Sequence, residues 1–350
     1  MSGTFPTSVC GLCDSWEHCQ PSRLGQDVET SSCFHYRRAI HLDHAKTHFS
    51  DLRKTFTDRN LVDKLDKTES FLLSLLAKAQ QDFSGLLEFS LAVNGTPKEA
   101  KQRSSYRFSY SFAEWEYEER GSSLAVAKLF FTLLGPEVGG HAKKLLALAR
   151  TPLVQQLLVG LDAHGENVRN KIYFQFNCGH EEKKQTWLAH LLPEEVVQGY
   201  SGQLERLHLV GVDFTGQGLS GIKLYFLFEM LSSDEIRIGY ADNPLMMTLA
   251  NTLPSGLKEF LSVSRHSQPD LSAPKQELDF GLVASGLTPA IMQTFRVDSR
   301  LTDALESLET LGAGRHWWPT RLSMPKNGEG RLNLYYLLLD PPESGKSGSR

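Results

Sequence analysis

The sequence lacks three features that would assign it to common classes of protein. No apolar run approaches the roughly 18 residues that a membrane-spanning helix needs. Residues 1–30 lack the apolar stretch of a secretory signal peptide. Lys and Arg number 37 against 41 Asp and Glu, a formal net charge of -4, whereas a general nucleic-acid binder draws on surplus cations. We therefore expect a cytoplasmic protein that binds neither membrane nor nucleic acid.

Cysteines are also too few for a disulfide framework. The chain has five in 350 residues, and four of them are Cys10, Cys13, Cys19 and Cys33. One interpretation is a zinc site, with Cys10 and Cys13 as two ligands and Cys19 with Cys33 or His18 as the others. The spacing matches no regular zinc module, so we favour a reduced, loosely ordered arm.

Composition divides the chain into three parts. We expect a flexible cysteine-containing arm over residues 1–40, a single folded domain over 41–340 and a disordered polar tail over 341–350. Hydrophobic residues make up 40% of the chain and charged residues 22%, which excludes global disorder. The middle part therefore carries the fold and any activity.

Helical stretches and pairs of strand-like runs alternate through this middle part, and the strand pair recurs five times. Several strands show strict alternation of apolar and polar residues, as in Tyr106, Phe108 and Tyr110. The predicted strand pairs are 86–93 with 103–112, 157–163 with 169–178, 206–214 with 221–229, 257–264 with 275–283, and 315–323 with 331–339. The predicted helices cover 41–81, 122–156 with a break near Gly135, 182–200, 232–252 and 288–311.

The polar faces of these strands favour a closed barrel over an open sheet. Helices have to cover the apolar faces, and the polar faces repeat Tyr near Lys or Arg with few acids, as at Lys171 with Tyr173 and Lys223 with Tyr225. An open sheet facing water would mix acids and bases. The predicted fold class is α+β, a ten-stranded antiparallel β-barrel with a solvent-filled lumen surrounded by α-helices, wide enough for a ligand.

Familiar catalytic and cofactor motifs do not explain the sequence. Residues 216–221 match G-x-G-x-x-G, but they lie between two predicted strands with no helix after them, so we interpret them as a hairpin turn. There is no phosphate-binding loop, no H-E-x-x-H, no nucleophile elbow and no aspartate-rich box for magnesium-bound diphosphate. A diphosphate ligand would therefore be held mainly by cationic side chains.

The expected lumen suits such a ligand. Lys and Arg bind phosphate oxygens through charge-assisted hydrogen bonds, and tyrosine faces stabilise a carbocation. Glu88, between Leu87 and Phe89, is the one acid that alternation directs inward on the first strand, where it could take a proton from a nucleophile. Ser109 and Ser111 are small residues on the same predicted face and could leave space for a longer ligand.

Short segments of these strands resemble a known enzyme family in their order and spacing, over roughly residues 60–340. The segments include Leu86-Leu87-Glu88 with Tyr106-Arg107-Phe108, Gly160-Leu161-Asp162 with Lys171-Ile172-Tyr173, Leu209-Val210-Gly211-Val212-Asp213-Phe214 with Ile222-Lys223-Leu224-Tyr225, and Asn333-Leu334-Tyr335-Tyr336. They are similar to the ABBA-fold prenyltransferases, and among these to the cyanobactin-type peptide prenyltransferases. The N-terminal arm and the fourth strand pair, with Glu277 and Asp279, depart from the family pattern.

The resemblance implies an enzyme that moves a dimethylallyl or geranyl group from its diphosphate to an acceptor. It requires no cofactor beyond this co-substrate, although magnesium could stimulate it. Glu88 would be the base. The diphosphate would be bound by Arg107, Lys171, Lys223 and Arg331, the cation would be shielded by Tyr173, Tyr225 and Tyr335, and Ser109 and Ser111 would lie along the prenyl chain.

The expected acceptor is a side chain of a ribosomally made, macrocyclic peptide, and the enzyme is expected to act as a monomer. One alternative is a prenyltransferase of a small aromatic such as an indole or a phenol. A peptide enzyme would leave the barrel mouth open, whereas a small-aromatic enzyme would cap it. An alternative of another class is a barrel that binds a ligand without chemistry, in which Glu88 would be dispensable.

Overall fold

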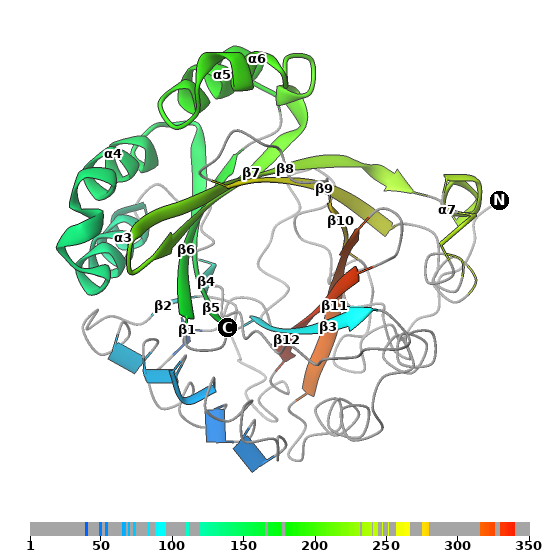
Figure 1. Cartoon of the computed structure of the whole chain (residues 1–350), viewed down its shortest axis with the longest axis horizontal. Helices are drawn as coiled ribbons and strands as arrows, with labels where there is room; N and C mark the ends of the chain where they lie inside the picture. The colour runs from blue at the N-terminus through cyan, green and yellow to red at the C-terminus, as the bar shows by residue number, and fades with distance from the viewer. Residues whose placement is uncertain are drawn as a thin grey trace, which may run out of the picture.

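An antiparallel sheet of ten strands forms the centre of the computed structural model (Figure 1). Its strands are β3 (Glu88–Gly95), β4 (Tyr110–Ser111), β5 (Val154–His164), β6 (Asn167–Phe176), β7 (Leu207–Thr215), β8 (Gly218–Leu231), β9 (Leu257–His266), β10 (Lys275–Asp279), β11 (His316–Pro325) and β12 (Gly330–Leu339). Their order across the sheet is β3-β12-β11-β10-β9-β8-β7-β6-β5-β4. A second, two-stranded sheet pairs β1 (Ala39–Ile40) with β2 (Phe83–Ser84).

The structure describes part of the chain, and the predicted zinc ligands, Arg107, Ser109 and the predicted helix 288–311 lie outside that part. The described residues are 39–40, 49–50, 53–54, 65–67, 69–70, 73–74, 83–84, 88–95, 110–111, 120–164, 167–176, 179–231, 233–239, 241–243, 247, 251, 257–266, 275–279, 316–325 and 330–339.

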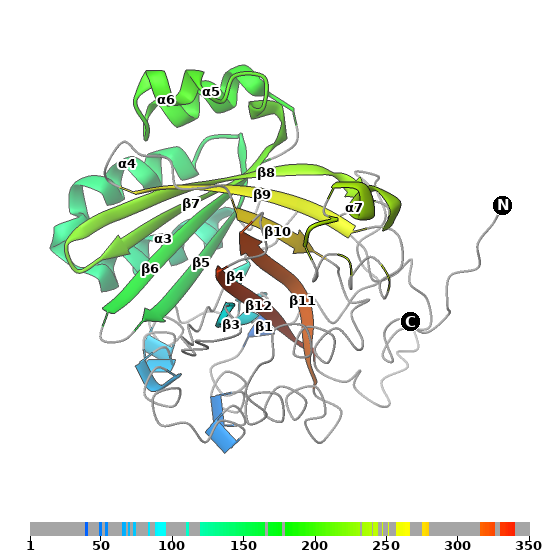
Figure 2. The same cartoon turned by 45° about the vertical axis from the view of Figure 1, so that its right-hand side comes forward.

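Four of the five predicted strand pairs are confirmed, because β5 pairs with β6, β7 with β8, β9 with β10 and β11 with β12. The strands of the first predicted pair, β3 and β4, lie at the two ends of the sheet. Figures 1 and 2 show the sheet strongly curled, with β3 and β12 across from β7 and β8. In the part of the chain that the structure describes, no ladder joins β3 to β4, so the ten-strand antiparallel order is established and closure of the barrel stays a prediction.

Helices cover the outer side of β5 to β8 (Figures 1 and 2). The predicted break near Gly135 separates α3 (Arg120–Leu134) from a short 3-10 turn, η5 (Pro136–Val138), and from α4 (Gly139–Ala149). Gly135 has φ 88°, a left-handed conformation that glycine adopts without strain. After η6 (Leu204–Arg206) the chain enters β7, and after β8 it forms α7 (Ser233–Gly239).

Two helix predictions were too long, and proline explains both. The second part of 122–156 ends at Ala149, because Pro152 disfavours a helical conformation at Thr151, and β5 begins at Val154. The predicted helix 182–200 is two helices, α5 (Glu181–Ala189) and α6 (Glu194–Gln198), and Pro193 is the N-cap of the second.

Aromatic side chains attach these helices to the sheet. Phe214 on β7 makes edge contacts with Phe130 and Phe131 of α3, at ring-centroid distances of 6.5 and 5.8 Å. Trp187 of α5 packs on Phe174 and Phe176 of β6, at 5.1 and 4.9 Å, and its indole Nε1 donates a hydrogen bond to a main-chain carbonyl of α4 at 3.2 Å. The apolar face of the sheet is therefore its outer face, as the strand pattern predicts.

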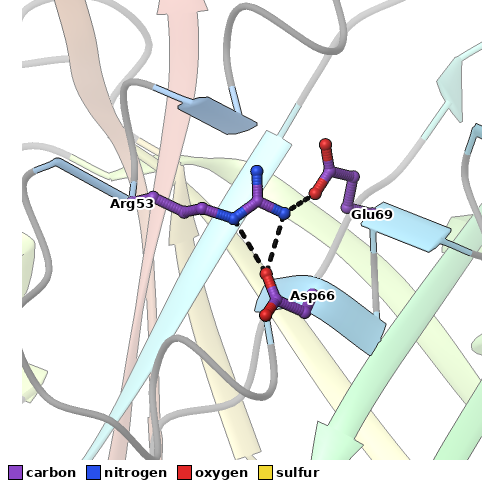
Figure 3. Close-up of polar contacts among 3 residues, drawn as sticks. All are labelled: Arg53, Asp66 and Glu69. Carbon is purple, nitrogen blue, oxygen red and sulfur yellow. Dashed lines mark hydrogen bonds and ion pairs between the residues drawn. The ribbon is translucent and has the colours of Figure 1, made fainter.

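An ion-pair cluster at Arg53 joins helical residues near the N-terminus (Figure 3). The Arg53 guanidinium donates to Asp66 Oδ1 through Nε at 2.8 Å, and it also pairs with Glu69. Arg53 and Asp66 are 35% and 52% exposed, so the ion pair between these two residues contributes little stability. A search of the described helices for one long and apolar enough to cross a membrane finds none.

Candidate functional site

The ladders place the described candidate residues of β6, β7 and β8 on the inner face of the curled sheet. Residues directly opposite in an antiparallel ladder share a face. Lys171 pairs with Asp213, and Tyr173 pairs with Gly211, which in turn pairs with Lys223. Val210, Val212 and Phe214 alternate with these residues and are completely buried on the helix-covered side.

The same face continues through the other half of the sheet. Glu277 pairs with Ser323, and Ser323 pairs with Asn333; Leu337, four residues beyond Asn333, pairs with Glu88. At the opposite end, Ser111 pairs with Leu158, the partner of Tyr173. The register thus brings these predicted site residues to one face: Glu88, Ser111, Lys171, Tyr173, Lys223, Tyr225, Arg331 and Tyr335.

Two lysines and an aspartate form a charged row on this face. Lys171 and Asp213 are each only 3% exposed. Lys223 Nζ donates a hydrogen bond to Asp213 Oδ2 at 2.8 Å, and the Lys223 side chain is 21% exposed. When all three groups are ionised, the row carries one excess positive charge, which suits an anionic ligand.

Two tyrosines lie beside the charged row. The rings of Tyr173 and Tyr225 are 6.2 Å apart with an interplanar angle of 62°, the edge-to-face geometry that aromatic pairs favour. Both residues are buried, and Tyr335, from the other half of the sheet, is also buried. Cationic and aromatic side chains therefore occupy neighbouring positions on one face.

Sequence reasoning missed the pairing of Asp213 with Lys223 and expected the inner face to be poor in acids. That expectation was wrong, because Asp213 lies in the charged row and the register places Glu277 and Asp279 on the same face. The sequence does contain a pattern that predicts an inward position for Asp213. Residues 209–214 alternate between apolar outward positions and the inward positions of Gly211 and Asp213.

The glycine-rich stretch is a hairpin turn, as predicted. Thr215 pairs with Gly218 across a two-residue connection, and Gly218 has φ 100°. Among the described residues, no three or more His, Cys, Asp or Glu side chains come together as a metal site would require. Catalysis without a metal stays a prediction.

Comparison with known proteins finds structures of similar fold but no protein of similar sequence. No family model matches the chain, and no curated protein matches it. Among solved structures, the fold is similar to that of ABBA-type prenyltransferases. One is the prenyltransferase PriB in a ternary complex with L-tryptophan and dimethylallyl thiolodiphosphate, at 12% identity and a TM-score of 0.53, covering 87% of this chain and 99% of that chain.

Two further PriB structures match over the same 87% of this chain and 99% of theirs. The binary complex with product diphosphate has 13% identity and a TM-score of 0.52, and the apo form has 11% and 0.51. At such identities the likeness establishes the fold.

Proposed function

We propose that the chain is a prenyltransferase that moves a dimethylallyl or geranyl group from its diphosphate to an acceptor. The observation that carries this proposal is the row of Lys171, Asp213 and the partly exposed Lys223 beside the rings of Tyr173 and Tyr225. Cations for a diphosphate and aromatic faces for an allylic cation are the two requirements of the reaction. The PriB complexes support it, because they contain product diphosphate in one case and a dimethylallyl thiolodiphosphate in the other.

In the proposed reaction, the bond between the allylic carbon and the diphosphate oxygen breaks, and its electron pair leaves on the diphosphate. Lys171 and Lys223, with Arg107 and Arg331, stabilise the charge that develops on this leaving group. The ring faces of Tyr173, Tyr225 and Tyr335 stabilise the allylic cation. The acceptor then attacks the cation, and Glu88 takes the proton that the acceptor loses.

Before the donor binds, Asp213 supplies the negative charge that the lysines need. A buried ammonium group is costly without an anion nearby, and Asp213 is bonded to Lys223 and paired in register with Lys171. The diphosphate adds further negative charge to the same row. Ser109 and Ser111 are proposed to adjoin the far end of the prenyl chain, where small side chains leave room.

The proposed acceptor is a side chain of a ribosomally made, macrocyclic peptide. This assignment depends on the similarity of the strand segments to the cyanobactin-type enzymes. A small aromatic acceptor such as an indole is the second candidate, and it is favoured by the PriB complex that contains L-tryptophan. We further propose that the enzyme is a cytoplasmic monomer.

The test is incubation of the chain with dimethylallyl or geranyl diphosphate and a panel of acceptors, read by mass spectrometry. The panel contains cyclic peptides, their linear forms, L-tryptophan and a phenol. The expected product is an acceptor heavier by one prenyl group, formed also in excess chelator. Intact diphosphate bound without transfer to any acceptor would favour the ligand-binding barrel. Complete loss of prenyl transfer in chelator, with transfer restored by magnesium, would contradict catalysis without a metal.

A further inference from the structure

Gly211 lies at the centre of β7, beneath the two tyrosine rings. It is buried and pairs with Tyr173 on one side and with Lys223 on the other. A Cβ atom at this position would lie 2.8 Å from Cε1 and 2.9 Å from Cδ1 of Tyr173, and 3.5 Å from Cε2 of Tyr225. Non-bonded carbon atoms prefer about 3.5–4.0 Å. The observed place of the Tyr173 ring therefore requires that residue 211 has no side chain.

A methyl group at residue 211 would push the Tyr173 ring away from β7. The backbone of β7 lies beneath the ring, and the outer side of that strand is filled by Val210 and Val212, which are completely buried. The Tyr225 ring, 6.2 Å away, blocks movement along the sheet towards β8. The ring would therefore be displaced away from β7, towards the side of the inner face that is proposed to hold the donor.

We infer that Gly211 is a specificity-determining residue that sets how much room the inner face offers to the prenyl chain. The inference rests on the proposed function, because Tyr173 is one of the rings proposed to face the donor. With glycine at 211 the ring lies close to the strand, so more of the space proposed for the donor chain is left to it. A side chain at 211 moves the ring into that space and penalises a ten-carbon chain more than a five-carbon chain.

The test compares Gly211→Ala with Gly216→Ala. The control carries the same substitution in the turn of the same hairpin, where a Cβ meets nothing within 4 Å. Calorimetry would measure the affinities of inorganic diphosphate, dimethylallyl thiolodiphosphate and geranyl thiolodiphosphate. In Gly211→Ala we expect diphosphate affinity to hold, and the affinity of the geranyl analogue relative to diphosphate to fall about tenfold or more, with a smaller fall for the dimethylallyl analogue.

Unchanged relative affinities of both analogues in Gly211→Ala would overturn the inference, as would an equal change in Gly216→Ala. The proposed function fails separately, if neither analogue binds the unaltered chain more tightly than inorganic diphosphate does. If Gly211→Ala does not fold, Tyr173→Leu tests the same idea in reverse. Without the ring, the ratio of geranyl to dimethylallyl affinity should rise, and adding Gly211→Ala to Tyr173→Leu should change it no further. A ratio that does not rise would overturn the inference.

Discussion

Lys171 is almost completely buried on the inner face, and Lys223 lies diagonally across from it with its ammonium on Asp213. Each ammonium can donate a charge-assisted hydrogen bond to a phosphate oxygen. We expect Lys171→Ala or Lys223→Ala to weaken binding of a prenyl thiolodiphosphate by about 1.5–3 kcal/mol, the scale of a hydrogen bond to a charged group. Calorimetry measures this, with Lys183→Ala, an exposed lysine of α5, as control. Full affinity in both lysine variants would remove these residues from the diphosphate site.

Removal of Asp213 has a separate structural consequence, because it takes away the carboxylate that lies on β7 between Lys171 of β6 and Lys223 of β8. Breaking a buried ion pair on one side costs about 3–5 kcal/mol, and the 21% exposure of Lys223 favours the lower end of that range. We expect Asp213→Ala to lower the free energy of unfolding by about 3 kcal/mol, measured by urea denaturation.

The double variant Asp213→Leu with Lys223→Met is the matched comparison, because it removes both charges of the hydrogen-bonded pair. It should be more stable than Asp213→Ala, since it does not leave Lys223 without its carboxylate. Equal stabilities in the single and double variants would show that leaving Lys223 without its carboxylate costs no stability.

At the scale of single elements, Trp187 is the aromatic side chain that packs α5 on the sheet. Trp187 is 3% exposed and contacts two phenylalanines of β6. Trp187→Ala should lower the free energy of unfolding by about 3–5 kcal/mol, because it leaves a cavity between helix and sheet. Gln185→Ala, at an exposed position of the same helix, should change it by about 0.5 kcal/mol at most. A small effect of Trp187→Ala in chemical denaturation would contradict this account of the packing.

The strand pairs were the most predictable elements, because each inner strand alternates apolar and polar residues with the period of a β-strand. The same alternation placed Lys171, Tyr173, Lys223 and Tyr225 together before any contact was known. Helix ends were less predictable, since leucine- and valine-rich residues after Pro152 suit a buried strand as well as a helix. The closeness of Gly211 to the Tyr173 ring was beyond sequence reasoning, because it depends on the register between two strands and on the conformation of one side chain.

For the whole molecule, the outstanding structural prediction is that β3 and β4 close the sheet into a barrel. In a strand with one neighbour, alternate amides bond to that neighbour and the others face the open edge. If the barrel closes, all amides of β3 except those at its ends should be protected from hydrogen exchange, as in β7, which pairs with both β6 and β8. Hydrogen exchange measured for each backbone amide of β3 tests this prediction. Protection limited to every second residue of β3 would show an open edge instead.

Curling of the whole sheet also brings the strand of Glu88, the proposed base, opposite the strands of the charged row (Figures 1 and 2). Glu88 lies on the terminal strand β3, where it pairs with Leu337 of β12. Lys171 and Lys223 lie on β6 and β8, at least five strands away along the sheet. Figures 1 and 2 show β3 facing β7 and β8 across the curl. General-base assistance contributes about 10²–10⁴-fold. Glu88→Gln keeps the shape of the side chain and removes its charge, so prenyl transfer to a phenol, imidazole or guanidinium acceptor should fall by that factor.

Donor binding to Glu88→Gln should hold, since the lysines proposed to bind diphosphate are unchanged. The loss should be smaller for an indole carbon, which attacks first and gives up its proton afterwards. Glu182→Gln, the same change at an exposed position of α5, is the control and should leave turnover unaltered. Steady-state kinetics on each acceptor, with calorimetry of the donor analogue, separates the two effects. Turnover by Glu88→Gln equal to that of the unaltered chain on every acceptor would exclude Glu88 as the base, and the proton would then have to leave through another group on the inner face.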